Sequence, residues 1–111
     1  MGVTKQFCTF HLGPYLFGVE VLWVQEVLRY QTTTRVPLAP AVIEGLINLR
    51  GQIVTAINLR RRMGLADRAE GESPMNVVIR TGDGAVSLLV DEIGDVVEAD
   101  QSQFEAPPET V

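Results

Sequence analysis

Residues 44–65, EGLINLRGQIVTAINLRRRMGL, decide the fold, because two runs rich in β-branched residues flank Gly51 and Gln52. A glycine that opens a two-residue connection suits a type II′ turn, whose twist matches that of the flanking strands. With that turn, Arg50 faces Ile53, and side chains alternate between the two faces of a hairpin. One face is wholly apolar: Ile47, Leu49, Val54 and Ala56. The other face mixes polar and apolar side chains: Leu46, Asn48, Arg50, Ile53, Thr55 and Ile57. This mixed face is too apolar for water alone and too polar for a dry core, which makes it the candidate binding surface.

The composition predicts one globular domain. The chain has 111 residues, of which 46% are hydrophobic and 21% are charged, as is usual for soluble domains. Its net charge of -5 argues against a protein that binds nucleic-acid duplexes, since those carry a basic footprint. No segment resembles a targeting peptide or approaches the roughly 18 apolar residues of a membrane-spanning helix. We therefore expect a cytoplasmic protein whose partners are proteins or small molecules.

The segments before the hairpin read as strands. Three short runs are rich in aromatic and β-branched residues, and a helical turn at residues 21–23 separates the last two: 5–13, 15–21 and 24–30. Residues 32–45 contain Pro37 and Pro40, which cannot donate to a sheet, so this segment is a crossing loop.

The segments after the hairpin continue the β pattern. Residues 58–64 predict a short helix that ends at Gly64, and a polar loop follows it. Residues 75–100 read as three strands with turns at 82–84 and at Gly94. Many short strands with little helix predict a small barrel or a pair of barrels.

Three segments in this order resemble the CheW-like domain family: VQEVLRY (24–30), EGLINLRGQIVTAINLRRRMGL (44–65) and VSLLVDEIGDVVE (86–98). The resemblance covers nearly the whole chain. It implies an all-β, CheW-like fold of two small SH3-like five-stranded barrels with short helical turns. Residues 1–111 would form a single domain, with the first sub-barrel from about 5–35 and the second from about 45–100.

The resemblance also implies a function, that of a non-catalytic chemotaxis adaptor. Such an adaptor couples the cytoplasmic tip of a methyl-accepting chemoreceptor to the regulatory domain of the histidine kinase CheA. The groove between the barrels would take the receptor helix, and the barrel ends would take the kinase's own CheW-like domain. Carried onto this sequence, the partner-binding residues are Val24, Glu26, Asn48 and Arg50, with Gly45 and Gly51 shaping the backbone around them.

Arg50 and Ile53 are binding candidates from their own chemistry as well. A planar guanidinium with several donors suits carboxylates or carbonyls on a partner, and Ile53 supplies apolar cover on the same face. Glu26 also fits a simpler interpretation, as the solvated side of an edge strand.

The sequence departs from the family pattern at three places. Thr55 and Asn58 stand where the family usually has proline and aspartate, which predicts a less rigid strand exit. Family members continue past the position of Val111 with strands that complete the first barrel. We therefore expect either a first barrel that is incomplete at its C-terminus or self-association through its unpaired strands.

Other conspicuous residues have plainer explanations. We expect Arg60, Arg61 and Arg62 to form a solvated helix face. Trp23 is expected in the core, although a tryptophan near a groove can also anchor a partner. With a single histidine, His11, and a single cysteine, Cys8, the chain has no basis for a metal site or a histidine triad, so no metal or cofactor is expected. His11 is expected in a strand and Cys8 as a packed thiol.

Two alternatives to a free adaptor stay open. The chain fits a regulatory domain excised from a CheA-type kinase, or the adaptor half of a protein fused to a receiver domain, and flanking sequence would decide. A small oligonucleotide-binding barrel is a third candidate, which would expose aromatic side chains among basic ones.

Overall fold

The computed structural model describes residues 4–100. Eight strands, a 3-10 turn and one short helix follow one another along the chain: β1 (Thr4–Leu12), β2 (Tyr15–Glu20), η1 (Val21–Trp23), β3 (Val24–Leu28), β4 (Ile43–Leu49), β5 (Gln52–Asn58), α1 (Leu59–Arg62), β6 (Met75–Thr81), β7 (Gly84–Val90) and β8 (Glu92–Asp100). The all-β architecture, the three N-terminal strands, the helical turn between them and the short helix are as predicted from the sequence.

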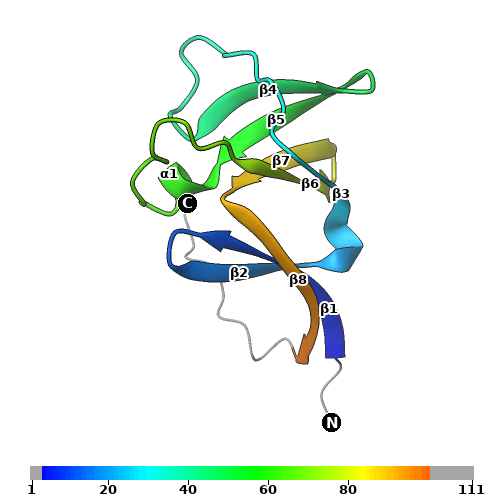
Figure 1. Ribbon diagram of the computed structural model, residues 1–111. Coiled ribbons are helices and arrows are strands. Elements are labelled where there is room, and N and C mark those ends of the chain that lie inside the picture. Colours follow the sequence, from blue (N-terminus) through cyan, green and yellow to red (C-terminus); the bar gives the residue numbers. More distant parts are fainter. Residues whose placement is uncertain (1–3, 101–111) are drawn as a thin grey trace.

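These strands form two sheets that pack against each other (Figure 1). The first sheet has the strand order β2-β1-β8, and the second has the order β3-β6-β7-β5-β4. Most neighbours are antiparallel, but β5 and β7 run parallel. Within the described residues the chain passes between the sheets twice, through η1 and through Asp91.

The sheets divide the chain differently from the expected ranges 5–35 and 45–100. Strand β3 pairs with β6 in the second sheet, and β8 pairs with β1 in the first. Pairing partners so distant in sequence leave no local signal, because hydrophobic alternation gives the face of a strand and not its neighbour. The expected lack of strands at the C-terminus concerns residues outside the described ones.

The second sheet curls until its two edges meet. Thr34, in the segment after β3, exchanges two backbone hydrogen bonds of 2.8 Å with Leu46 on the edge strand β4. A Cβ built on Gly45 would lie 2.5 Å from the carbonyl oxygen of Thr34, so a residue without a side chain is needed for this approach. The closure brings β3 close to the β4–β5 hairpin.

The hairpin register predicted from the sequence is wrong by two residues. Leu49 pairs with Gln52, so the turn residues are Arg50 and Gly51 and not Gly51 and Gln52. Both turn residues have positive φ, 51° and 87°, as a type I′ turn requires. A shift of two residues keeps each side chain on its face, which is why the prediction that Ile47, Leu49, Val54 and Ala56 are buried is nevertheless confirmed.

The turn predicted at Gly94 is also absent. Gly94 lies inside β8, and the chain turns instead at Asp91, between β7 and β8. A Cβ on Gly94 would lie 2.5 Å from the hydroxyl oxygen of Thr9 on the neighbouring strand, so this glycine permits close packing in place of a turn.

Two apolar clusters stabilise the molecule. Inside the curled second sheet, the hairpin's apolar face packs with Val78 and Leu89. Between the sheets, Phe10 and Leu12 of β1 pack with Leu59 of α1 and with two valines of the second sheet, Val77 and Val90. The second cluster joins the two sheets.

Candidate functional site

The ion pair between Glu26 and Arg50 lies at the rim of the second sheet. The guanidinium donates from Nη1 and Nη2 to the two carboxylate oxygens at 2.7 and 2.6 Å, which is the bidentate geometry that gives the strongest such pairs. Glu26 comes from β3 and Arg50 from the β4–β5 turn, so closure of the sheet brings them together. Arg50 therefore lies in the turn, and not on the mixed strand face where the sequence placed it.

Asn48 fixes the shape of this turn. Its side-chain oxygen accepts a 2.9 Å hydrogen bond from the backbone N–H of Gly51, which satisfies a donor that the sheet leaves free. Across the hairpin, Asn48 pairs with Ile53, whose side chain is 60% exposed. We call these five residues, Glu26, Asn48, Arg50, Gly51 and Ile53, the hairpin rim.

The hairpin rim is charged at neutral pH. The hydrogen bond from Arg50 lowers the pKa of Glu26, and the same hydrogen bond raises the pKa of Arg50. The side chain of Glu26 is 17% exposed, whereas that of Arg50 is 73% exposed. An arginine has five donor hydrogens, so the exposed guanidinium retains donors for an acceptor on another molecule.

Two of the seven predicted site residues lie elsewhere. Val24 pairs with Ile79 and packs, half-buried, against the apolar cluster between the sheets. Gly45 is buried under the backbone of Thr34. In the structure Val24 packs and Gly45 permits the close approach of the backbone, while the other five residues form the hairpin rim. The part of all seven in partner binding stays a prediction.

Two features near the start of β3 were not predicted from the sequence. Gln25 of β3 donates a long hydrogen bond of 3.4 Å to Gln52, beside the turn. Trp23, predicted to lie in the core, is 55% exposed at the end of η1, next to Leu22, which is 74% exposed. Position within an apolar run was the only signal available for Trp23, and it predicted the wrong environment.

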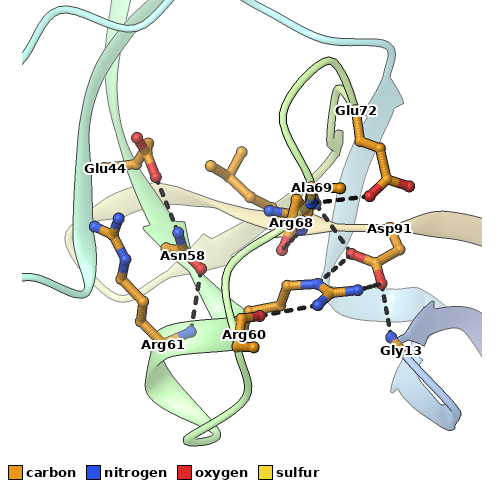
Figure 2. A network of polar contacts seen from close by, with 11 residues as sticks. Gly13, Glu44, Asn58, Arg60, Arg61, Arg68, Ala69, Glu72 and Asp91 are labelled. Atoms are coloured by element: carbon orange, nitrogen blue, oxygen red, sulfur yellow. Dashed lines mark hydrogen bonds and ion pairs between the residues drawn. The ribbon is translucent and has the colours of Figure 1, made fainter.

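A second polar cluster lies around Asp91 (Figure 2). Arg60 of α1 donates to its two oxygens at 2.9 and 2.5 Å, and Arg68 places Nε 3.0 Å from Oδ1. The side chains of Arg60 and Arg68 are only 17% and 11% exposed. The prediction that all three helix arginines form a solvated face is therefore wrong for Arg60, because its acidic partner is 31 residues away in sequence.

The neighbouring arginine behaves differently. Arg61 pairs with Asp67 at 2.9 and 3.1 Å, and both side chains are well exposed. Asn58 caps the helix by accepting from the N–H of Arg61 and donates to Glu44, as Figure 2 shows. These contacts hold α1 against the loop that follows it and against β4 without burying the charge of Arg61.

The remaining single residues match their predictions. His11 lies exposed in β1 between Leu16 and Glu92. Cys8 is a buried free thiol, and burial raises its pKa.

Among residues 4–100, no three histidine, cysteine, aspartate or glutamate side chains gather as a metal site would require. A search of the same residues finds no helix that is both long enough and apolar enough to span a membrane.

The fold and the rim together define a class: an all-β domain of two packed sheets that offers a polar and apolar surface at a hairpin turn. The profile of the family described as CheW-like domain matches residues 6–111. The chain belongs to the CheW-like domain family, as its sequence indicated.

Known relatives agree with this membership. The chain is 31% identical over 110 residues to "Chemotaxis protein CheW" of Treponema pallidum, covering 96% of this chain and 65% of that protein. It is 34% identical over 107 residues to the protein of that name in Bacillus subtilis, covering 96% and 69%. The crystal structure of scaffolding protein TtCheW from Thermoanaerobacter tengcongensis superposes with a TM-score of 0.84 at 30% identity, covering 98% of this chain and 75% of that one. The chain thus spans about two thirds of the length of these curated relatives.

Proposed function

We propose that this chain acts as a chemotaxis adaptor that couples the cytoplasmic tip of a methyl-accepting chemoreceptor to the regulatory domain of the kinase CheA. Relatives across most of its length are chemotaxis proteins, and its structural neighbour is a scaffolding protein, which supports a role in assembly. The role is non-catalytic and cytoplasmic, and it works through contacts on two partners. It needs no cofactor.

The single observation that carries the proposal is the exposed guanidinium of Arg50 on the rim. Glu26 orients the guanidinium from one side, and its exposed donors face solvent. A preoriented arginine loses less conformational freedom when it meets a carboxylate or carbonyl of a partner helix. Ile53 beside it offers apolar area for the same contact.

Charge reversal at Arg50 tests this proposal. Arg50→Glu keeps the buried hairpin face intact but places two carboxylates at the rim, so we expect it to weaken receptor-tip binding by about 30-fold or more. Arg61→Glu is the matched control, since Arg61 is also an exposed, ion-paired arginine but lies on α1. Isothermal titration with a receptor-tip fragment, and separately with the CheA regulatory domain, measures both affinities.

The proposal is wrong if Arg50→Glu, folded by circular dichroism, binds both partners as tightly as the unaltered chain. Equal losses of affinity for Arg50→Glu and Arg61→Glu would also contradict it, because the effect would then come from the change in net charge and not from the hairpin rim. Self-association through the first sheet stays a prediction, for which light scattering of the purified chain is the direct measurement.

A further inference from the structure

Asp91 is the single residue between β7 of the second sheet and β8 of the first. Its carboxylate receives the bidentate contact of Arg60 and lies 3.0 Å from Arg68. It also accepts a 2.6 Å hydrogen bond from the backbone N–H of Gly13, at the tip of the β1–β2 hairpin. Its own N–H donates to the carbonyl of His11 at 2.9 Å. The carboxylate therefore joins the β1–β2 turn of the first sheet to α1 and the loop that follow β5 of the second sheet (Figure 2).

The cluster of Asp91, Arg60 and Arg68, called the ionic lock below, carries two cations for one anion. None of the three side chains is more than 20% exposed. The Nε of Arg68 is buried and lacks a hydrogen bond of good geometry, so the ion pair with Asp91 is the interaction that compensates it. Without the carboxylate, two guanidiniums would face each other with little water, an arrangement that the structure cannot tolerate unchanged.

The apolar cluster between the sheets should constrain their relative orientation less sharply than directional contacts do. Apolar packing is nearly non-directional, whereas charge-assisted hydrogen bonds are directional. At one end of the interface the chain passes between the sheets through η1, and at the opposite end lie α1 and the tip of the β1–β2 hairpin (Figure 1). The ionic lock joins the two sheets at that opposite end, where a Cβ built on Gly13 would lie 4.0 Å from Nη2 of Arg60.

We propose that the ionic lock sets the angle between the two sheets and so makes the receptor and kinase contacts depend on each other. This consequence rests on the proposed adaptor function. The resemblance implies that the receptor helix lies between the two barrels, and a change in the angle between the sheets would change the distance between the surfaces that face that helix. Coupling between two sites needs an element whose arrangement both ligands influence, and the angle between the sheets is such an element.

The angle is measurable in the isolated chain. Backbone residual dipolar couplings from the two sheets should fit one common alignment tensor in the unaltered protein. Asp91→Asn keeps the shape of the side chain and removes its charge. In this variant we expect the first sheet to need a separate alignment tensor of smaller magnitude, because the first sheet would reorient relative to the second. Arg61→Gln, on the same helix but outside the lock, should behave like the unaltered chain.

A common tensor with unchanged orientation in folded Asp91→Asn would overturn the proposal. If Asp91→Asn does not fold, Arg60→Gln serves instead, because it leaves Asp91 paired with Arg68. A common, unchanged tensor in that variant would likewise overturn the lock.

Binding data separate the lock from the proposed function. We expect a receptor-tip fragment to change the affinity for the CheA domain by about fivefold or more in the unaltered chain, and this coupling to approach unity in Asp91→Asn. If the tensors separate but the unaltered chain binds neither partner, the lock stands and the adaptor function fails. If both partners bind and the coupling is the same in Asp91→Asn, the lock does not transmit between them, and this inference fails while the adaptor function stands.

Discussion

The hairpin rim and the ionic lock use the same chemistry in different surroundings. Both pair a carboxylate with an arginine in bidentate geometry, across 24 residues in one case and 31 in the other. The arginine side chain is 73% exposed at the rim, whereas Arg60 and Arg68 in the lock are 17% and 11% exposed. The residue types are the same, so the exposure of the arginine side chain to water is what distinguishes the two clusters.

The two clusters should accordingly differ in how much each contributes to the free energy of unfolding. An exposed ion pair contributes little to stability, because water and salt screen it and two long side chains must be ordered. Removal of one partner from a poorly hydrated pair leaves an uncompensated charge, which is costly. Variants at the two clusters test this contrast directly.

The largest expected effect is that of Asp91→Ala. It removes the only carboxylate of the ionic lock and leaves Arg60 and Arg68 facing each other, so the free energy of unfolding should fall by about 3 kcal/mol. Urea unfolding followed by the fluorescence of Trp23, the single tryptophan, gives this value. A loss no larger than that of Asp67→Ala, which removes the carboxylate of an exposed pair, would remove the contrast between the clusters.

Acidification should lower the stability of the protein through the same carboxylate, that of Asp91. The hydrogen bond from Arg60 holds the pKa of Asp91 below its ordinary value, and the N–H of Gly13 acts in the same direction. The unfolded chain therefore binds a proton more readily than the folded one. The stability contributed by Asp91 is present above the unfolded pKa and is lost as pH falls through the folded pKa, so we expect a decline below about pH 5.

Thermal unfolding at a series of pH values checks this dependence. Asp91→Asn should show a shallower decline than the unaltered chain, since it has no proton to bind at that position. Parallel curves for the two proteins would mean that other carboxylates account for the acid sensitivity.

The smallest expected effect is that of Glu26→Gln at the hairpin rim. The side chain keeps its length and loses its charge. Its partner Arg50 is 73% exposed, so water and salt can take over the guanidinium's contacts, and the midpoint of thermal unfolding should shift by no more than about 2 °C. Differential scanning calorimetry measures the shift. A drop as large as that of Asp91→Asn would show that the rim, too, is mainly structural.

The chain's local properties could be read from its sequence with success. Alternation of side chains predicted the buried face of the β4–β5 hairpin, although the strand register was wrong by two residues and the turn by one. The resemblance to the CheW-like domain family, now confirmed, predicted the fold class. Five of the seven predicted site residues lie together in the hairpin rim. Their role in binding stays a prediction.

Strand partners and charge partners, by contrast, were decided by the tertiary structure. The pairing of β5 with β7 and of β8 with β1, and the meeting of Asp91 with Arg60, join residues far apart in sequence. The sequence by itself determined which side chains seek burial and where turns are permitted, because those are properties of neighbouring residues. Only the closed sheets decided that Arg50 remains in water and Arg60 does not, because access to water depends on what the rest of the chain places above each side chain.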